Sequence, residues 1–509
     1  MKKKTARVLA LLACVTTIFA TPMTVLAEEG YTYNYDYFEE IQYSPDAYEV
    51  VGVYTSATLN LDKKLSKPEG LFVYGKSVYI CDTGNNRIIE LYREDQTNFS
   101  VKRIITEFSG HEVNTFSNPT DIAVDEDGNL YIADKGNARI VKLDKDLNFL
   151  LEFTKPLDAT FDQSLDFMPS KLAIDTAGRA YVIATNVNKG LIKFENNGVF
   201  SGFVGASKVT YNWADYIQKK FATKAQRAQL ESFVPTEYDN VYMDYEGFIY
   251  TCTTNATGND LNSGKTDAVR RLNLMGDDIL IRNGNFRVIG DVKYENAAGY
   301  DGPSLFTDVT ALENGTYVCL DKTRKRLFAY DDQGRLLYAF GGPGGIDGCF
   351  RNPVAIEHMG HDLFVLDSLD CSLTVFTTTE YGEQIFSAIE YFQDGKYTES
   401  GEAWQKVMDM NGNYDLAYIG IGRALLGDKK YKEALPYFKL KWDNDNYSKA
   451  FKQYRKQWVE DNIVIIIIIF FALLIIPVAK GRIERLKWEI DTSDAFKFNN
   501  YEEDKKKKK

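Results

Sequence analysis

The stretch from Pro119 to Asp144, PTDIAVDEDGNLYIADKGNARIVKLD, contains three short apolar runs separated by two polar turns. Asp127-Gly128, in the first turn, supplies the left-handed backbone conformation that a tight hairpin requires. The apolar runs alternate with polar residues or are continuous, as in strands that are buried between packed sheets. The stretch therefore predicts a unit of three antiparallel strands.

Six segments repeat this plan of a proline followed by three strands, and they begin at Pro68, Pro119, Pro169, Pro235, Pro303 and Pro353. A fourth strand follows in five of them: VKRIITEFSG, NFLLEFT, GVFSGFVG, FRVIGDV and RLLYAFGG. The sixth segment has none after Phe376, but AYEVVGVYTS, from Ala47, precedes the first segment. We predict that this N-terminal strand completes the last sheet, which closes a mainly β, six-bladed β-propeller over residues 46–381.

The repeats resemble the NHL family. The resemblance is carried by YIADKGNARI, from Tyr131, by YICDTGNNRI, from Tyr79, and by the glycine-rich link FGGPGGIDGCFRNP, which ends at Pro353. It implies a six-bladed propeller. The third and fourth repeats depart from the motif, because Ala184 and Thr253 replace its aspartate and long insertions such as residues 206–234 follow. A uniform ligand surface around the ring is therefore not expected.

The two ends of the chain predict secretion and a membrane anchor. A basic start and an apolar run indicate a signal peptide over residues 1–27, followed by a linker over residues 28–45. An uncleaved anchor, or a lipoprotein attached through Cys14, are the alternatives. Residues 463–479 contain no charge and predict a transmembrane helix rather than a buried core helix, with a basic tail over residues 480–509. The signal peptide orients the chain, so we expect a single-pass cell-membrane protein of a bacterial surface, with residues 28–462 outside and the tail in the cytoplasm.

Between the propeller and the anchor, residues 382–461 are expected to be helical. Gly395-Lys396-Tyr397 recurs as Lys429-Lys430-Tyr431, and Trp404 recurs as Phe438, at the 34-residue period of tetratricopeptide repeats. The segment therefore predicts tetratricopeptide-like helix pairs, with an irregular helical stalk as the alternative.

Composition excludes some functions. The formal charge of −12 argues against nucleic acid as a partner. After Cys14, the remaining cysteines are odd in number and form no CxxC pair, so no disulfide framework is predicted. They are Cys81, Cys252, Cys319, Cys349 and Cys371.

The sequence shows no catalytic constellation, and it predicts no catalytic residue, cofactor or metal site. His358 and His361 form HxxH around a hairpin turn without a third ligand, and a solvated turn is the preferred interpretation. His111 is isolated in a loop. The acidic run at Asp125 lacks the acidic residue of a calcium loop's twelfth position, so it is interpreted as a hairpin turn.

A repeated aspartate and arginine, five residues apart, span the turn between the second and third strands. The pairs are Asp82 with Arg87, Asp134 with Arg139, and Asp321 with Arg326. We predict that they fix the turn by pairing within a blade or with the next blade. The functional alternative is that these turns form one rim of the ring and bind a ligand there.

Three functions remain open. The preferred one is a membrane-anchored binding or scaffold protein that presents the propeller and helical repeats to a protein or glycan outside the cell. The second is a metal-dependent lactonase, hydrolase or lyase, as in related propellers, with Glu69, Asp121 and Asp308 as inward-facing ligands. The third is an accessory subunit of a membrane transport complex, engaged through residues 463–479 and the tail.

Overall fold

The structure is a computed structural model that describes residues 31–506, apart from 159, 186, 206–237 and 293–301. The predicted signal peptide, the insertion at residues 206–234 and Pro235 lie outside the described residues. The chain divides into two compact units, residues 1–417 and residues 418–509.

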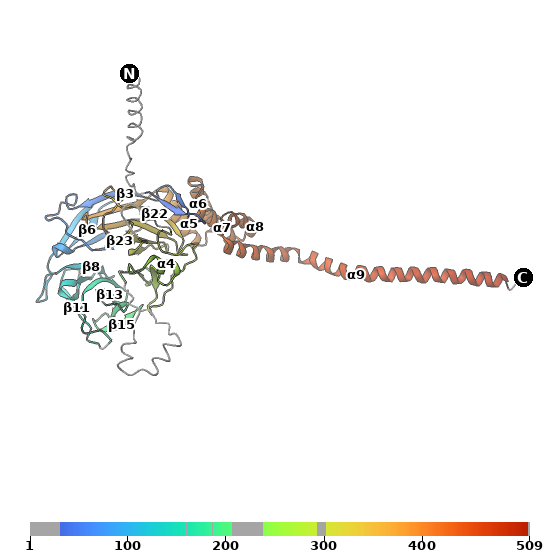
Figure 1. Ribbon diagram of the computed structural model, residues 1–509, viewed down its shortest axis with the longest axis horizontal. Coiled ribbons are helices and arrows are strands. Elements are labelled where there is room, and N and C mark those ends of the chain that lie inside the picture. Colours follow the sequence, from blue (N-terminus) through green and yellow to red (C-terminus); the bar gives the residue numbers. More distant parts are fainter. Residues whose placement is uncertain (1–30, 159, 186, 206–237, 293–301, 507–509) are drawn as a thin grey trace, which may run out of the picture. The chain divides into compact units, whose positions relative to one another are not determined.

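The first unit contains a six-bladed β-propeller (Figure 1). The inner strands of the six blades contact one another in a closed ring, in which each touches the next and the sixth touches the first. In blade order they are β4 (Gly70–Tyr74), β8 (Pro119–Val124), β12 (Pro169–Ile174), β16 (Asn240–Met243), β19 (Phe306–Ala311) and β23 (Pro353–Met359).

The remaining strands continue each sheet outward from its inner strand. They are β5 (Ser77–Asp82), β6 (Arg87–Arg93) and β7 (Phe99–Ile105) in blade one; β9 (Leu130–Asp134), β10 (Arg139–Leu143) and β11 (Phe149–Phe153) in blade two; β13 (Ala180–Ala184), β14 (Leu191–Phe194) and β15 (Phe200–Val204) in blade three; β17 (Ile249–Cys252) and β18 (Val269–Leu272) in blade four; β20 (Tyr317–Asp321), β21 (Arg326–Tyr330) and β22 (Leu336–Gly341) in blade five; and β24 (Asp362–Asp367) and β25 (Ser372–Thr378) in blade six. Gly128, Gly247 and Gly315 have positive φ in the hairpin turns, as predicted.

The N-terminal strand closes the ring as predicted. β3 (Tyr48–Thr55) pairs antiparallel with β25 along its whole length, from Ser372 opposite Thr55 to Thr378 opposite Tyr48. Tyr48 is buried, its ring stacks on Phe340 at 5.0 Å, and its hydroxyl donates to the carbonyl of His361 at 2.9 Å. The last sheet thus takes its outermost strand from the start of the chain.

The linker predicted for residues 28–45 is corrected by the structure. Residues in it form a hairpin of β1 (Tyr33–Tyr35) and β2 (Ile41–Tyr43), which extends the sheet of blade five beyond β22. Tyr33 and Tyr35 donate to the carboxylate of Asp291, which also pairs with Arg324 at 2.8 Å. These buried partners hold the hairpin in place.

The fourth strand predicted at FRVIGDV is also corrected, because the described residues of blade four form a sheet of three strands. The segment contacts blade five instead. Gly290 N donates to the Tyr330 hydroxyl at 3.0 Å, and the Asp291 carboxylate accepts from the two tyrosine hydroxyls of β1. At the outer edge of β18, Ile279 N donates to the Arg271 carbonyl at 2.7 Å. A short helix, α4 (Gly258–Ser263), lies between β17 and β18.

Helices follow the propeller. α5 (Glu380–Gln393) and α6 (Tyr397–Met410) belong to the first unit, and α5 is joined to blade five by a hydrogen bond of 2.6 Å from Gln393 Nε2 to the Asn314 carbonyl. α7 (Asp415–Gly427) and α8 (Tyr431–Leu440) follow. α6 and α8 begin at Tyr397 and Tyr431, at the spacing that the sequence repeat predicts.

In the second unit, α9 (Asn444–Lys506) is the last helix. Of the described residues, only Asn444–Ser493 of this helix are long and apolar enough to cross a membrane. Its apolar side chains between Ile463 and Val478 are largely exposed.

Candidate functional site

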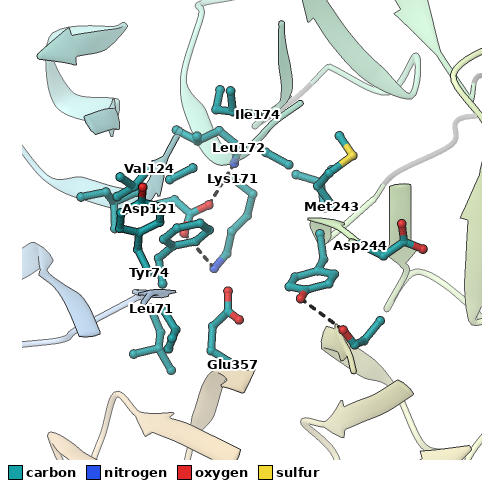
Figure 2. A pocket seen from close by; sticks show the side chains of 18 of the residues that line it. Leu71, Tyr74, Asp121, Val124, Lys171, Leu172, Ile174, Met243, Asp244 and Glu357 are labelled. Atoms are coloured by element: carbon teal, nitrogen blue, oxygen red, sulfur yellow. Dashed lines mark hydrogen bonds and ion pairs between the residues drawn. The ribbon is translucent and has the colours of Figure 1, made fainter. Parts of the chain in front are cut away.

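A cavity of about 620 Å³ occupies the propeller channel (Figure 2). It is lined by residues of all six inner strands and of the turns that follow them. A concave site with a few converging polar groups is where a propeller ligand is expected to bind.

One position of each inner strand forms a ring around the channel. Each ring residue pairs with the second-strand residue that precedes the motif's aspartate position. In blade order the six residues are Gly70, Asp121, Lys171, Asn240, Asp308 and Ala355. At Gly70 a Cβ would lie 2.7 Å from the Thr120 carbonyl oxygen, so a side chain would be excluded from this place in the ring.

The two aspartates of the ring join neighbouring blades. Asp121 accepts from Leu172 N at 2.9 Å, and Asp308 accepts from Ile356 N at 2.8 Å and from the Asn240 side chain. Each carboxylate therefore bridges its own inner strand to the next one. These contacts fix the geometry of the channel wall.

Lys171 provides the positive charge of this cluster. Its ammonium lies 3.6 Å from Asp121 Oδ1 and 3.5 Å from the Glu69 carbonyl oxygen. Figure 2 shows the side chains of Lys171 and Glu357 pointing toward one another across the channel. Glu357 lies on β23 and is 7% exposed.

Burial changes the protonation of these groups. It raises the pKa of Asp308 to about 7, and it raises the pKa of Glu357 well above its ordinary range, with the nearby Asp308 charge adding to the effect. Burial also lowers the pKa of His358 to about 4. Burial thus disfavours the ionised forms of Asp308 and Glu357, and it leaves His358 a neutral imidazole at neutral pH.

The residues that line the channel do not fit a divalent cation. Of the predicted ligands, Asp121 and Asp308 line the cavity, but Glu69 does not; its backbone carbonyl accepts from Lys171. No group of three or more His, Cys, Asp or Glu side chains in the described part of the chain is arranged to hold a metal ion. Lys171 already places a positive charge beside Asp121, and a metal ion there would be repelled.

The mouth of the cavity is aromatic and acidic. Tyr74 and Tyr245 are 38% and 60% exposed there, and Glu126 and Glu313 are also exposed. Other carboxylates at the mouth are held by cationic side chains of their own blades: Asp125 by Lys142 at 3.5 Å, Asp175 by Arg179 at 2.6 Å and Asp244 by Arg271 at 2.9 Å.

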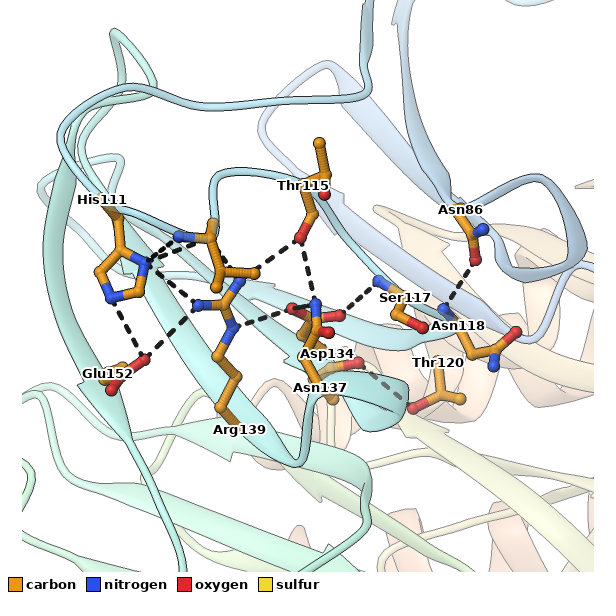
Figure 3. Close-up of polar contacts among 12 residues, drawn as sticks. Asn86, His111, Thr115, Ser117, Asn118, Thr120, Asp134, Asn137, Arg139 and Glu152 are labelled. Carbon is orange, nitrogen blue, oxygen red and sulfur yellow. Dashed lines mark hydrogen bonds and ion pairs between the residues drawn. The ribbon is translucent and has the colours of Figure 1, made fainter.

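The predicted rim residues lie away from this cavity, since none of the six lines it. Arg87 Nε donates to Asp82 at 2.7 Å in a buried ion pair. Arg139 Nε donates to Asp134 at 2.9 Å in a second buried pair (Figure 3). Asp134 also accepts from Ser117 N at 2.7 Å, which attaches the turn to the incoming loop.

The third predicted pair does not form. The Asp321 carboxylate accepts from Leu305 N and Thr323 N, at 3.0 and 2.8 Å. Arg326 instead lies over the rings of Tyr31 and Tyr33, at 4.4 and 5.0 Å. The guanidinium therefore contacts tyrosines of the N-terminal segment, and the sequence motif did not predict this contact.

The histidines are not in a solvated turn, which corrects the expectation for HxxH. His358 lines the cavity, and its Nδ1 lies 2.7 Å from the Thr310 hydroxyl. His361 contacts Glu383 and Glu390 of α5, each at 3.1 Å, so it attaches the helix to blade six. His111 lies 3.7 Å from Glu152 and 3.4 Å from Arg139 (Figure 3).

The first part of this chain is thus defined as a six-bladed β-propeller with a polar channel. Residues 116–143, which span most of blade two, match the NHL repeat family. No curated protein matches the sequence.

Several solved structures resemble the propeller remotely. Virginiamycin B lyase from Staphylococcus aureus is 11% identical, with 65% of this chain and 100% of that chain covered and a TM-score of 0.37. A streptogramin B lyase is 13% identical over 66% of this chain and 100% of its own, with a TM-score of 0.38. A gluconolactonase from Xanthomonas campestris is 11% identical over 62% of this chain and 86% of its own, with a TM-score of 0.37. Similarity this remote indicates no activity for this chain.

Proposed function

We propose that the protein is a membrane-anchored binding protein that takes a ligand into the propeller channel outside the cell. The cavity of about 620 Å³, walled by all six blades, is the observation that carries this proposal. Its described lining contains neither Ser nor Cys, and its histidine is occupied at Nδ1 by the Thr310 hydroxyl. That hydroxyl is fully buried and does not line the cavity, so a substrate in the channel would not reach it as a nucleophile.

The anchor completes the proposal. α9 supplies the apolar span, and the predicted signal peptide would place the propeller and helices α5 to α8 on the outer side. The basic residues that follow the span, among them Arg482 and Arg485, would then lie in the cytoplasm, where such residues are favoured.

We expect large side chains introduced at the mouth of the cavity to prevent ligand binding. Thr176 and Met243 line the cavity from blades three and four, and Thr176→Trp combined with Met243→Trp would narrow its entrance. Full-length protein in nanodiscs would be screened by thermal shift against small polar molecules of positive, zero and negative charge. A ligand at about 100 times its Kd adds about 2.7 kcal/mol of stability. Binding should appear in the wild type and be lost in the double variant.

The control is Leu150→Trp, which adds the same side chain on the outer strand β11, where Leu150 is 48% exposed. This variant should bind as the wild type does. Binding that survives in the double variant, or a screen in which nothing binds, contradicts a ligand site in the channel.

We expect the propeller to be accessible from outside intact cells. The full chain would carry one epitope after residue 30 and another at the C-terminus, and cells would be treated with external protease. The first epitope should be lost while the second stays intact until the membrane is permeabilised. The reverse pattern would place the propeller in the cytoplasm and refute the proposed orientation.

A further inference from the structure

The channel wall holds more buried carboxyl groups than positive charges. Asp121, Asp308 and Glu357 are 6%, 4% and 7% exposed, and Lys171 is the only Lys or Arg side chain that lines the described cavity. Lys171 forms its ion pair with Asp121, and no described Lys or Arg side chain forms an ion pair with Asp308 or Glu357. Burying a carboxylate without a partner is costly, which is why these two groups resist ionisation.

Glu357 lines the cavity, and its carboxyl group lacks a well-placed hydrogen-bond donor. Among the described residues, its carboxylate receives only the backbone N–H of the adjacent His358, at 3.4 Å to Oε2. Its other oxygen is left for whatever enters the channel. A ligand that donates to this oxygen, which lines the cavity, would complete the hydrogen bonding of Glu357.

The walls around this group suit an organic cation better than a metal ion. Phe72, Tyr74, Tyr242 and Tyr245 line the cavity, and aromatic faces attract ammonium groups by cation–π interaction. At the mouth, Glu126 and Glu313 form no ion pair with any described residue, so they add a negative potential that draws cations inward.

We infer that the channel binds a small organic molecule carrying a protonated amine, and that Glu357 and Asp308 hold this ammonium group. The inference rests on the proposed function and names its ligand class. A neutral ligand would leave the two carboxyl groups without an ionic partner, and an anionic ligand would be repelled by them when they ionise. The ammonium would instead form charge-assisted hydrogen bonds with both carboxylates.

Binding should release protons. The titratable groups that face Glu357 are Asp308 of β19, Lys171 of β12, Asp121 of β8, Tyr242 of β16 and its neighbour His358. An arriving ammonium stabilises the carboxylate forms of Glu357 and Asp308, so their pKa values fall in the complex. In the free protein, Asp308 is protonated below about pH 7. Affinity for the amine should therefore rise with pH, by at most tenfold per pH unit for each proton released.

The test uses two sets of molecules that share a shape and differ in charge, with the full chain in nanodiscs. One set is 2-phenylethylamine, 2-phenylethanol and 3-phenylpropionate; the other is glucosamine, glucose and glucuronate. Calorimetry at pH 7 should show that the amine of at least one set binds ten times or more tightly than its neutral counterpart, and that the anion does not bind. The set that responds distinguishes an aryl amine from an amino sugar.

Variants assign the charge recognition to named residues. Glu357→Gln should weaken binding of the amine by tenfold or more and reduce the proton release, which is read from heats in buffers of different ionisation enthalpy. Glu313→Gln should weaken binding a few-fold in low salt only. Glu112→Gln, an exposed carboxylate outside the cavity, is the matched control and should have no effect.

The outcomes separate this inference from the proposed function. Equal or tighter binding of a neutral or anionic member, lost in the Thr176→Trp, Met243→Trp variant, overturns the ammonium assignment and leaves the channel as a ligand site. Amine binding that Glu357→Gln does not weaken also overturns the assignment. If no amine binds, the inference fails, and if no molecule of any charge binds, the proposed function fails with it.

Discussion

Lys171→Met is expected to destabilise the propeller at pH 8 by about 3–5 kcal/mol, the cost of removing one partner of a buried ion pair. Methionine fills a similar volume, so the loss is mainly electrostatic. Asp121, which is 6% exposed in the channel wall, would then carry a charge without a partner, beside Asp308 and Glu357. Urea unfolding of the first unit, followed by tryptophan and far-UV signals, measures the loss.

The effect of this substitution should depend on pH. In the variant, all three carboxyl pKa values lie above their unfolded values, because burial raises them and no ammonium lowers them. A raised carboxyl pKa favours folding at low pH and disfavours it as pH rises through the folded value. The cost should therefore shrink to about 1 kcal/mol near pH 5, where the carboxyl groups are largely protonated.

Two further variants keep this prediction testable if Lys171→Met does not fold at pH 8. Lys193→Met removes a partly exposed lysine, 3.6 Å from Glu195, and should cost under about 1 kcal/mol at any pH. Lys171→Met combined with Glu357→Gln removes one carboxyl as well and should recover part of the stability. A loss of equal size at pH 5 and pH 8 would show that Lys171 acts through packing and not through charge.

The propeller could be predicted from the sequence because the pattern that indicates it repeats along the chain. Three strands, a glycine turn and a proline recur along the chain, so the number of blades and the closing strand could be counted. Those signals are local, and each repeat supports the others. The pairs Asp82 with Arg87 and Asp134 with Arg139 followed for the same reason, since their spacing fits one hairpin.

The channel cluster could be predicted only in part. Asp121 and Asp308 were recognised as inward-facing, but Lys171 and Glu357 were not. The ring position holds aspartate in only two blades, and Glu357 lies two residues beyond the ring position of its own strand, so no repeated residue marked either side chain. Aligning the six inner strands by the residue before the motif's aspartate would have shown this ring. The alternation of Tyr31, Tyr33 and Tyr35 was likewise a strand signal that the linker interpretation missed.

Contacts between distant segments could not be predicted from a local pattern. The departure of residues 286–292 toward blade five depends on Tyr33 and Tyr35, which lie more than two hundred residues earlier. The same is true of Arg326, whose place is set by Tyr31. In both cases a buried charge takes the partner that lies nearest in space, and sequence spacing does not encode that distance.

Replacement of residues 47–55 by a Gly–Ser linker of the same length is expected to prevent cooperative folding of the propeller. The replacement removes β3, so the hydrogen-bonding edge of β25 and the buried side chains of Leu373 and Val375 become exposed. It also removes Tyr48, which packs between blades five and six. The expected loss is about 5 kcal/mol or more, as large as the total stability of many domains.

The physical reason is that the ring has a single seam. Blades one to five are each built from strands that are consecutive in the chain, and the N-terminal hairpin of β1 and β2 only extends the outer edge of blade five. Blade six, in contrast, takes its own outermost strand from the opposite end of the chain. If the strand acts as a latch, a synthetic peptide of residues 45–58 added in trans should restore the unfolding transition, because it offers β25 the same edge. A peptide with Val51→Asp and Val53→Asp should restore less. An unchanged melting transition in the linker variant would mean that the inner strands alone hold the ring closed, and that β3 only covers an edge.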